Sequence, residues 1–287
     1  YRDVHLLAFE ENLGFAGGYN RAIEELDYQT VILLNSDVEL TSGWLDQPMQ
    51  LLNTSPEIAA VQPTLRAQRS PKDFEYAGAA GGFIDRLGYP FCRGRIFDTI
   101  EEDRGQYADS VDLFWASGAC LIIRRAVYRE VGGLDTLFFA HQEEIDLCWR
   151  LNARGWRIVS APQSIVYHIG GASLSADSPR KVFLNFRNNL LMIYKNLPAP
   201  TLHRVLFARM ILDLVAMLVY LLRLRPGQAA SVLKGWRCFL IKRQRYESTR
   251  QENLKKTVRP ISPELMKPYS LLFQYYFKGR KRYSDLP

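Results

Sequence analysis

Val31-Ile32-Leu33-Leu34-Asn35-Ser36-Asp37-Val38-Glu39 is the stretch of sequence that decides the fold. Its four leading residues are all apolar, which is typical of a buried strand, and the polar residues begin where that strand ends. In sheets that alternate with helices, ligands collect at the carboxyl ends of the strands. We therefore expect the acids after this strand, Asp37 above all, to face a site for a metal-bound diphosphate.

A second acidic cluster lies far along the chain. Glu143-Glu144-Ile145-Asp146 follows the stretch GGLDTLFFAH and opens a segment with apolar positions at Ile145 and Trp149. This spacing predicts a short amphipathic helix that carries Glu144 near its start. The two clusters together suggest one site that holds a cation and another that supplies a base.

The charges of this 287-residue chain are unevenly spread. Residues 1–179 hold 15 Lys and Arg against 25 Asp and Glu, whereas residues 180–287 hold 22 against 5. The length and the 47% hydrophobic content allow a substantial core in one or two domains. The charge asymmetry predicts that the C-terminal part meets an anionic surface, either nucleic acid or the inner leaflet of a membrane.

The apolar segment 202–224 separates these two alternatives. Its longest uncharged piece, residues 214–222, is nine residues long, and a spanning helix needs about 20 apolar residues. We therefore expect an interfacial amphipathic helix on an anionic membrane, with a helix packed on the catalytic domain or on a second subunit as the alternative. Nucleic acid is disfavoured, because no base-reading motif accompanies the charge.

The remaining pattern predicts an α/β domain with a C-terminal helical appendage. Expected strands cover residues 4–9, 31–34, 58–63, 111–116, 119–123 and 156–161. Expected helices cover residues 20–26, 44–52 and 125–131, and helices dominate from Pro179 onward. We expect residues 14–18 to form a flexible turn and residues 66–109 to form an irregular excursion that covers the site.

The four cysteines are expected to be free thiols. They are widely separated and form no C-x-x-C pair: Cys92, Cys120, Cys148 and Cys238. Buried thiols in a reducing cytosol are the simplest explanation of this pattern.

Several short motifs, taken in order, carry a family resemblance. They are residues 11–20 (ENLGFAGGYN), 33–37 (LLNSD), 117–119 (SGA), 132–135 (GGLD), 143–150 (EEIDLCWR) and His168. In this order the chain resembles the inverting family 2 glycosyltransferases of the GT-A fold, a Rossmann-like nucleotide-diphospho-sugar transferase fold, and in particular their rhamnosyltransferase-like branch. The resemblance covers about residues 5–195. It implies a GT-A catalytic domain over residues 1–198, and it leaves residues 199–287 as a basic, helical, membrane-associating region.

Family members usually begin with a strand, a base-binding loop and a helix that have no counterpart before Val4. The resemblance therefore implies that the chain begins inside the fold, with the first βαβ unit missing.

The resemblance also implies a donor side of the site. Asp37 takes the place of the family's metal-ligating acid, for Mg²⁺ or Mn²⁺, and His168 completes the metal or phosphate site. Asn35 replaces the first acid of the usual D-x-D string and is a poorer cation ligand that suits sugar or ribose. Glu39 is either a second ligand or a solvent-facing acid. Candidate donor contacts at the glycine-rich segment are Asn12, Gly17 and Asn20, with a purely structural turn as the alternative.

On the acceptor side, the resemblance assigns Glu144 as the general base. Glu143 and Asp146 would orient the acceptor or support the helix. Arg150 either neutralises diphosphate or pairs with Asp146 one helical turn away. Bordering the acceptor cleft are Gly118 and Trp115, where the indole would stack on a sugar ring or simply belong to the core.

The implied function is transfer of a sugar, with inversion, from a nucleotide-diphosphate donor to a saccharide or lipid-linked saccharide. The branch suggests dTDP-rhamnose as donor. The implied setting is cell-surface polysaccharide biosynthesis, with the protein cytoplasmic and peripheral on the inner face of the cell membrane. The processive synthases are a poorer match, because their Q-x-x-R-W string is absent. The alternative from another class is a non-catalytic saccharide-binding or scaffold protein derived from a glycosyltransferase.

Overall fold

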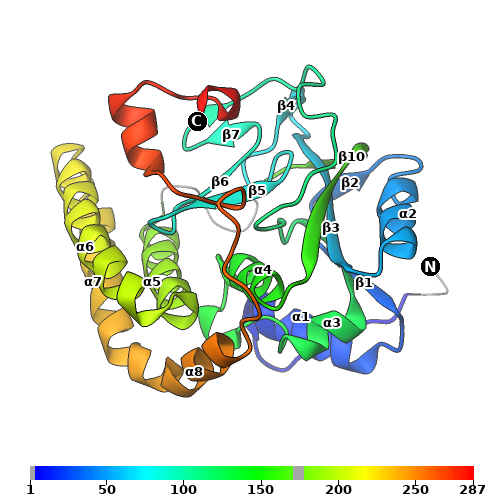
Figure 1. Cartoon of the computed structure of the whole chain (residues 1–287), viewed down its shortest axis with the longest axis horizontal. Coiled ribbons are helices and arrows are strands. Elements are labelled where there is room, and N and C mark those ends of the chain that lie inside the picture. Colours follow the sequence, from blue (N-terminus) through cyan, green and yellow to red (C-terminus); the bar gives the residue numbers. More distant parts are fainter. Residues whose placement is uncertain (1–3, 171–177) are drawn as a thin grey trace.

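The computed structural model describes residues 4–170 and 178–287, and a mixed β-sheet forms its centre (Figure 1). The sheet runs in the order β1-β9-β3-β10-β2, with β4 paired to β3. Its strands are β1 (Thr30–Leu34), β2 (Val38–Leu40), β3 (Ile58–Ala67), β4 (Ser70–Phe74), β9 (Cys120–Arg124) and β10 (Arg157–His168). Strands β3 and β10 are parallel, and the other pairings are antiparallel.

Helices cover both faces of this sheet. They are α1 (Gly14–Glu25), α2 (Asp46–Thr54), α3 (Arg125–Glu130) and α4 (Glu143–Ala153), with the short 3₁₀ turn η1 (Thr136–Phe138) before α4. Successive strand residues point to opposite faces, so Leu121 and Ile123 enter the core shared with α1 and α4, while Ile122 enters the core under α2. The predicted strand 31–34 and the α/β architecture are confirmed.

The glycine-rich segment is helical, so the expectation of a flexible turn over residues 14–18 is wrong. Helix α1 begins at Gly14, whose φ of +68° favours glycine. A Cβ on Gly14 would lie 2.6 Å from the carbonyl oxygen of Phe139, and the Phe15 amide donates to that same oxygen at 2.9 Å. The close approach of the 139 segment therefore requires glycine and sets the start of the helix.

Three other expected segments differ from the structure. Residues 4–9 form no strand. Residues 66–109, expected to be irregular, complete β4 and build a second sheet in the order β11-β5-β6-β7-β8. Its strands are β5 (Gly82–Asp85), β6 (Pro90–Cys92), β7 (Arg95–Ile96), β8 (Thr99–Ile100) and β11 (Met266–Lys267). Residues 111–116 contribute isolated bridges to Gly82 and Val159 instead of a strand.

The C-terminal part begins as a helical layer and ends as an extended strap. The helices are α5 (Pro179–Asn196), α6 (Ala199–Leu222), α7 (Pro226–Lys242), η2 (Arg243–Tyr246) and α8 (Glu247–Lys255). The expected helical character ends at Lys255, and the chain then crosses to the second sheet (Figure 1). There β11 pairs with β5, and the Leu271 amide donates to Asp85 at 2.8 Å. The strap ends with the π-turn η3 (Phe273–Phe277) and the 3₁₀ turn η4 (Tyr283–Asp285).

Candidate functional site

The pairing of two strands brings Asp37 and His168 together. Strands β10 and β2 are antiparallel with His168 opposite Val38, which follows Asp37 directly. The Asp37 carbonyl accepts from the Ile169 amide at 3.0 Å, and its carboxylate Oδ1 lies 3.1 Å from His168 Nε2. Two residues that are distant in the chain thus meet at the end of the central sheet.

Glu75, which the sequence analysis did not single out, holds the other side of the His168 ring. Its Oε1 lies 3.2 Å from His168 Nδ1, and Asn35 Nδ2 lies 3.3 Å from Nε2. Burial disfavours the imidazolium, but the carboxylates of Glu75 and Asp37 outweigh burial and raise the pKa of His168. No sequence signal marked Glu75, because its segment matched no motif and reaches the site only through the pairing of β4 with β3.

The chemistry of the Asp37–His168 pair fits a divalent cation. A carboxylate oxygen and an imidazole nitrogen are both ordinary ligands for such an ion. Within residues 4–170 and 178–287, no group of three or more His, Cys, Asp or Glu side chains could hold a metal. Asp37 and His168 would therefore supply part of a coordination shell, and the remaining ligands would come from the substrate or from water.

The start of α4 places two acidic side chains inside the protein. Glu143 is 3% exposed, and the Oε2 atoms of Glu143 and Glu144 are both buried without a hydrogen-bond partner in the described part of the chain. Burial raises the pKa of Glu144 to about 7. Burial and the neighbouring Glu144 charge raise the pKa of Glu143 well above its usual range. At neutral pH, Glu144 can therefore exchange a proton.

Asp146 and Arg150 lie in the core as an ion pair, which favours the structural alternative of each prediction over contact with substrate. Asp146 is fully buried and accepts from Lys195 at 2.8 Å and from Asn196 at 2.9 Å. Arg150 lies 3.0 Å from the same carboxylate and donates to the carbonyls of Val131 and Gly133. These two side chains are fully engaged in holding the 131–133 turn and α5 against α4.

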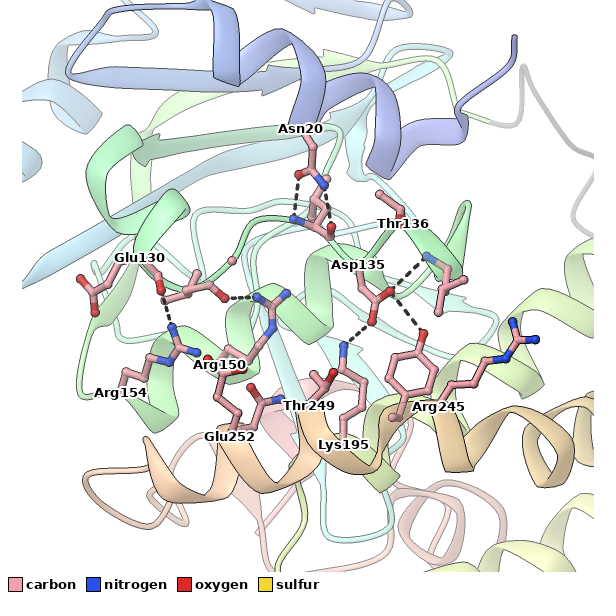
Figure 2. Close-up of a pocket in the computed structure, with 16 residues that line it drawn as sticks. Asn20, Glu130, Asp135, Thr136, Arg150, Arg154, Lys195, Arg245, Thr249 and Glu252 are labelled. Carbon is pink, nitrogen blue, oxygen red and sulfur yellow. Dashed lines mark hydrogen bonds and ion pairs between the residues drawn. The ribbon is translucent and has the colours of Figure 1, made fainter.

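Asn20 is likewise engaged in structural contacts, which favours the structural alternative over a donor contact. Its Nδ2 donates to the Leu134 carbonyl at 2.7 Å, and its Oδ1 accepts from the Leu134 amide at 3.0 Å (Figure 2). The same Oδ1 also accepts from the Tyr128 hydroxyl at 2.5 Å. Asn12 is exposed, and its Oδ1 accepts from the Gly14 amide at 2.9 Å ahead of α1. At Gly17, a Cβ would lie 2.8 Å from that of Leu13.

Of the two residues predicted to border the acceptor cleft, only Gly118 lies beside Glu144. A Cβ on Gly118 would lie 2.9 Å from the Phe15 ring and 3.8 Å from the Glu144 Cβ. Trp115 is 3% exposed, and its indole donates to the Phe83 carbonyl at 2.9 Å. The second sheet therefore covers Trp115. The side chain belongs to the core, which was the alternative to the predicted stacking of the indole on a sugar.

The Asp37–His168 pair and Glu144 lie on either side of a common segment, residues 118–119. The Asn35 amide donates to the Ala119 carbonyl at 3.0 Å, and Ala119 follows Gly118, which adjoins Glu144. Lys181, in the first turn of α5, interacts electrostatically with Glu75, which contacts His168, and with His141, which precedes α4. Burial is the main cause that lowers the pKa of Lys181. Lys181 is therefore a cationic side chain that interacts with groups on both sides of the candidate site.

A cavity among the described residues lies elsewhere. It has a volume of 470 Å³ and is lined by residues 130–137, α4, Lys195 and α8 (Figure 2). Asp135, on its wall, accepts from Lys195 at 2.5 Å and from Tyr246 at 3.2 Å. None of Asp37, His168 and Glu144 lines this cavity. We therefore assign the candidate site to Asp37, His168 and Glu144, which lie on either side of the segment 118–119.

Comparison with known proteins gives a consistent family. The family described as "Glycosyltransferase like family 2" matches residues 1–189. An N-acetylglucosaminyl-diphospho-decaprenol L-rhamnosyltransferase of Mycobacterium tuberculosis is 29% identical over 195 residues, which is 62% of each chain. The low-salt glycan biosynthesis hexosyltransferase Agl10 of Haloferax volcanii is 24% identical over 66% of this chain and 60% of its own. The chain thus spans about three fifths of the length of these relatives.

A solved structure shares the fold. The crystal structure of GalNAc-T7 with UDP, GalNAc and Mn²⁺ superposes with a TM-score of 0.50 at 14% identity, over 67% of this chain and 36% of that one. At this identity the likeness concerns the fold alone, and it agrees with the expected GT-A architecture.

Proposed function

We propose, because this chain belongs to the glycosyltransferase-like family 2, that it transfers a sugar with inversion from a nucleotide-diphosphate donor to a saccharide or lipid-linked saccharide. The proposed setting is cell-surface polysaccharide biosynthesis. The observation that carries this proposal is Glu144, a carboxylate with a buried, unpartnered oxygen and a pKa of about 7. It lies across Gly118 and Ala119 from the Asp37–His168 pair.

Each half of the site has a chemical role in this reaction. Asp37 and His168 would hold Mg²⁺ or Mn²⁺, which stabilises negative charge on a departing diphosphate. Lys181 adds a positive charge on the same side, and Asn35 is placed for a donor contact. Glu144 accepts the proton of the acceptor hydroxyl as that hydroxyl attacks. A single base is enough for inversion, because the attack comes from the face opposite the leaving group.

The names of the relatives narrow the substrates. The mycobacterial relative is named for transfer of L-rhamnose to a decaprenol-linked N-acetylglucosaminyl diphosphate, and another relative is the O-antigen biosynthesis protein RfbC of Myxococcus xanthus, 28% identical over 60% of this chain and 13% of its own. These names favour dTDP-rhamnose as donor and a polyprenyl-linked saccharide as acceptor. A polyprenyl acceptor would keep the enzyme at the inner face of the cell membrane.

Helix α6 supports a membrane location, because its polarity is inverted. Its buried residues include the charged Arg209 and Asp213. From residue 207 onward, its exposed residues are large and apolar: Phe207, Met210, Ile211, Leu214, Val215, Leu218, Val219, Leu221 and Leu222. A helix in water normally shows the opposite arrangement. We therefore propose that the apolar face of α6 contacts the acyl region of an anionic membrane, with the basic residues of the C-terminal part near the headgroups.

The length of α6 is compatible with this contact. Among the described residues, α6 is the helix whose length and composition would allow it to cross a membrane, with a mean hydropathy of 2.3 over its most apolar window. Because Arg209 and Asp213 pack inward against the protein, we favour an interfacial position over a spanning one.

A transfer assay tests the proposal. The protein is incubated with Mn²⁺, a panel of nucleotide sugars that includes dTDP-rhamnose, and a polyprenyl-diphosphate N-acetylglucosamine acceptor, and the products are measured by mass spectrometry. We expect one donor to yield a glycosylated acceptor whose new linkage has the anomeric configuration opposite to that of the donor. Donor binding without transfer to any acceptor would instead favour a non-catalytic saccharide-binding protein.

A further inference from the structure

The turn that precedes α4 is held by neighbouring asparagines of α5. Asn188 Nδ2 lies within hydrogen-bond distance of three backbone carbonyl oxygens, those of Phe138 at 3.1 Å, Ala140 at 2.9 Å and His141 at 2.7 Å. The side chain is fully buried, and its carbonyl accepts from Arg187 Nε at 2.7 Å. An amide has two N–H donors, so the turn uses all the donors of this side chain.

The conformation of this turn requires such support. Phe139, His141 and Gln142 have φ angles of +67°, +69° and +74°. Residues other than glycine rarely adopt positive φ, and they hold it only where the surroundings impose it. Without the bonds from α5, we expect this turn to relax, and the first residues of α4 would move with it.

Asn189 holds the end of the turn that adjoins the acids. Its Nδ2 donates to Gln142 Oε1 at 3.1 Å and to the Gly88 carbonyl at 2.8 Å. Its Oδ1 accepts from Arg209 of α6, which is 2% exposed. Gln142 is the residue before the acidic pair and has no capping bond of its own to α4. The orientation of Asn189 therefore ties Gln142 to the second sheet and to α6.

We propose that Asn188 and Asn189 are positioning residues that fix residues 139–142 and thereby aim the Glu144 carboxylate at the acceptor hydroxyl. They act through the backbone and through Gln142, and neither needs to touch the substrate. The inference rests on the proposed function, in which Glu144 is the base. Displacement of a reacting group by about 1 Å can cost on the order of 100-fold in rate.

A purely structural role would have a different signature. If the asparagines only stabilised the fold, their loss would lower the melting temperature and leave the properties of Glu144 unchanged. If they position the turn, its relaxation lets water reach Glu144, whose pKa burial now raises to about 7. Among the described residues, Glu143 and Cys148 interact electrostatically with Glu144, and because both lie on α4 they move with it and do not mask the change.

The test compares Asn188→Ala and Asn189→Ala with Asn152→Ala in the full chain. Asn152 is a buried asparagine that donates to the carbonyls of Phe114 and Cys148, at 2.8 and 2.9 Å, and has no bond to the turn. For each protein, amide hydrogen exchange of residues 137–145 is measured by mass spectrometry, and the pH–rate profile of sugar transfer is recorded. If Asn188→Ala does not fold, Asn188→Ser, which keeps one donor, replaces it.

We expect faster exchange over residues 137–145 in the two α5 variants but not in Asn152→Ala. We also expect kcat to fall about 10- to 100-fold with little change in donor KM, and the acid limb of the profile to move to lower pH. Unchanged exchange in the turn would overturn the proposal, and so would a lower rate with the acid limb in place. If the parent protein transfers no sugar at all, the proposed function fails, and the exchange measurement alone decides whether the asparagines hold the turn.

Discussion

The ammonium of Lys195 lies 2.8 Å from the carboxylate of Asp146, and the two side chains are 2% and 0% exposed. Burial alone would raise the pKa of Asp146, but Lys195, Arg150 and Asn196 outweigh burial and lower it. The acid that the sequence placed in the catalytic cluster is therefore neutralised inside the protein. It joins α4 to α5, the helix whose asparagines hold the turn before Glu144.

Asp146→Asn is expected to destabilise the protein by about 3 kcal/mol, because it leaves Lys195 and Arg150 buried with too little negative charge. Urea unfolding measures the change. Glu57→Gln, which removes an exposed ion pair with Arg157, is the control and should cost less than about 1 kcal/mol. Because the pKa of Asp146 is lowered on folding, its stabilising contribution exists at neutral pH and is lost in acid. Equal stability of Asp146→Asn and the parent at pH 7 would contradict this role.

Glu144→Gln is expected to reduce sugar transfer by about 100-fold or more while donor affinity persists. The amide keeps the shape of the side chain but cannot accept the hydroxyl proton. Glu143→Gln is the matched control, because it makes the same change in the neighbouring buried acid, which is not the proposed base, and it should change the rate little. If Glu143→Gln is inactive and Glu144→Gln is active, Glu143 and not Glu144 is the base.

The rate of transfer is expected to rise with pH through a midpoint near 7, where Glu144 loses its proton. The midpoint is measured as the acid limb of kcat/KM in the parent protein. A limb that stays near the ordinary carboxylate range, about 4 to 5, would show that Glu144 is hydrated or is not the base.

The same raised pKa predicts that Glu144→Gln stabilises the fold at alkaline pH. A carboxyl whose pKa rises on folding favours the folded state when protonated, and this advantage is lost as the pH rises through the folded pKa. At pH 8 the parent protein holds a buried charge that the amide removes, for a gain of about 3 kcal/mol. Thermal melts of both proteins at pH 4 and pH 8 check this, and we expect the difference only at pH 8.

Asp37→Ala is expected to abolish Mn²⁺-dependent donor binding without unfolding the domain. Asp37 is partly exposed at the end of the sheet, so its loss removes a ligand and little packing. Calorimetric titration of the donor with and without Mn²⁺ measures the effect. Glu39→Ala, a nearby exposed acid on β2, is the control and should bind like the parent unless Glu39 is a second ligand. If Asp37→Ala binds the donor with the same Mn²⁺-dependent affinity as the parent, Asp37 is not a metal ligand.

Leu214→Glu combined with Leu218→Glu is expected to release the protein from vesicles that contain anionic lipid. Both side chains lie on the exposed apolar face of α6, at 43% and 53% exposure, so charge there opposes insertion and leaves the core intact. Co-sedimentation measures binding, and Ile100→Glu, an equally exposed apolar position on β8, is the control. Unchanged co-sedimentation of the double variant would favour a protein partner for α6. Deleting the C-terminal residues would be a poor test, because β11 pairs with β5.

The sequence alone predicted the elements that depend on local pattern. The apolar run 31–34 followed by Asp37 and the helix with Glu144 near its start appear in the structure as expected. Both predictions rest on the spacing of apolar and polar residues within a single strand or helix, and this pattern can be read from a short contiguous segment. The ordered motifs predicted the family for the same reason, because each motif is short and contiguous.

The tertiary structure alone decided which polar residues remain available for chemistry. Asp146 and Glu144 belong to one four-residue cluster, but Lys195 and Asn196, from another helix, donate hydrogen bonds to Asp146 and not to Glu144. Trp115 is buried under the second sheet, which no sequence motif predicted. Glu75 contacts His168 because of strand pairing. The charge state and accessibility of a side chain depend on groups that the fold brings from distant segments. Sequence pattern therefore identified the acids, and packing determined which of them can act as a base.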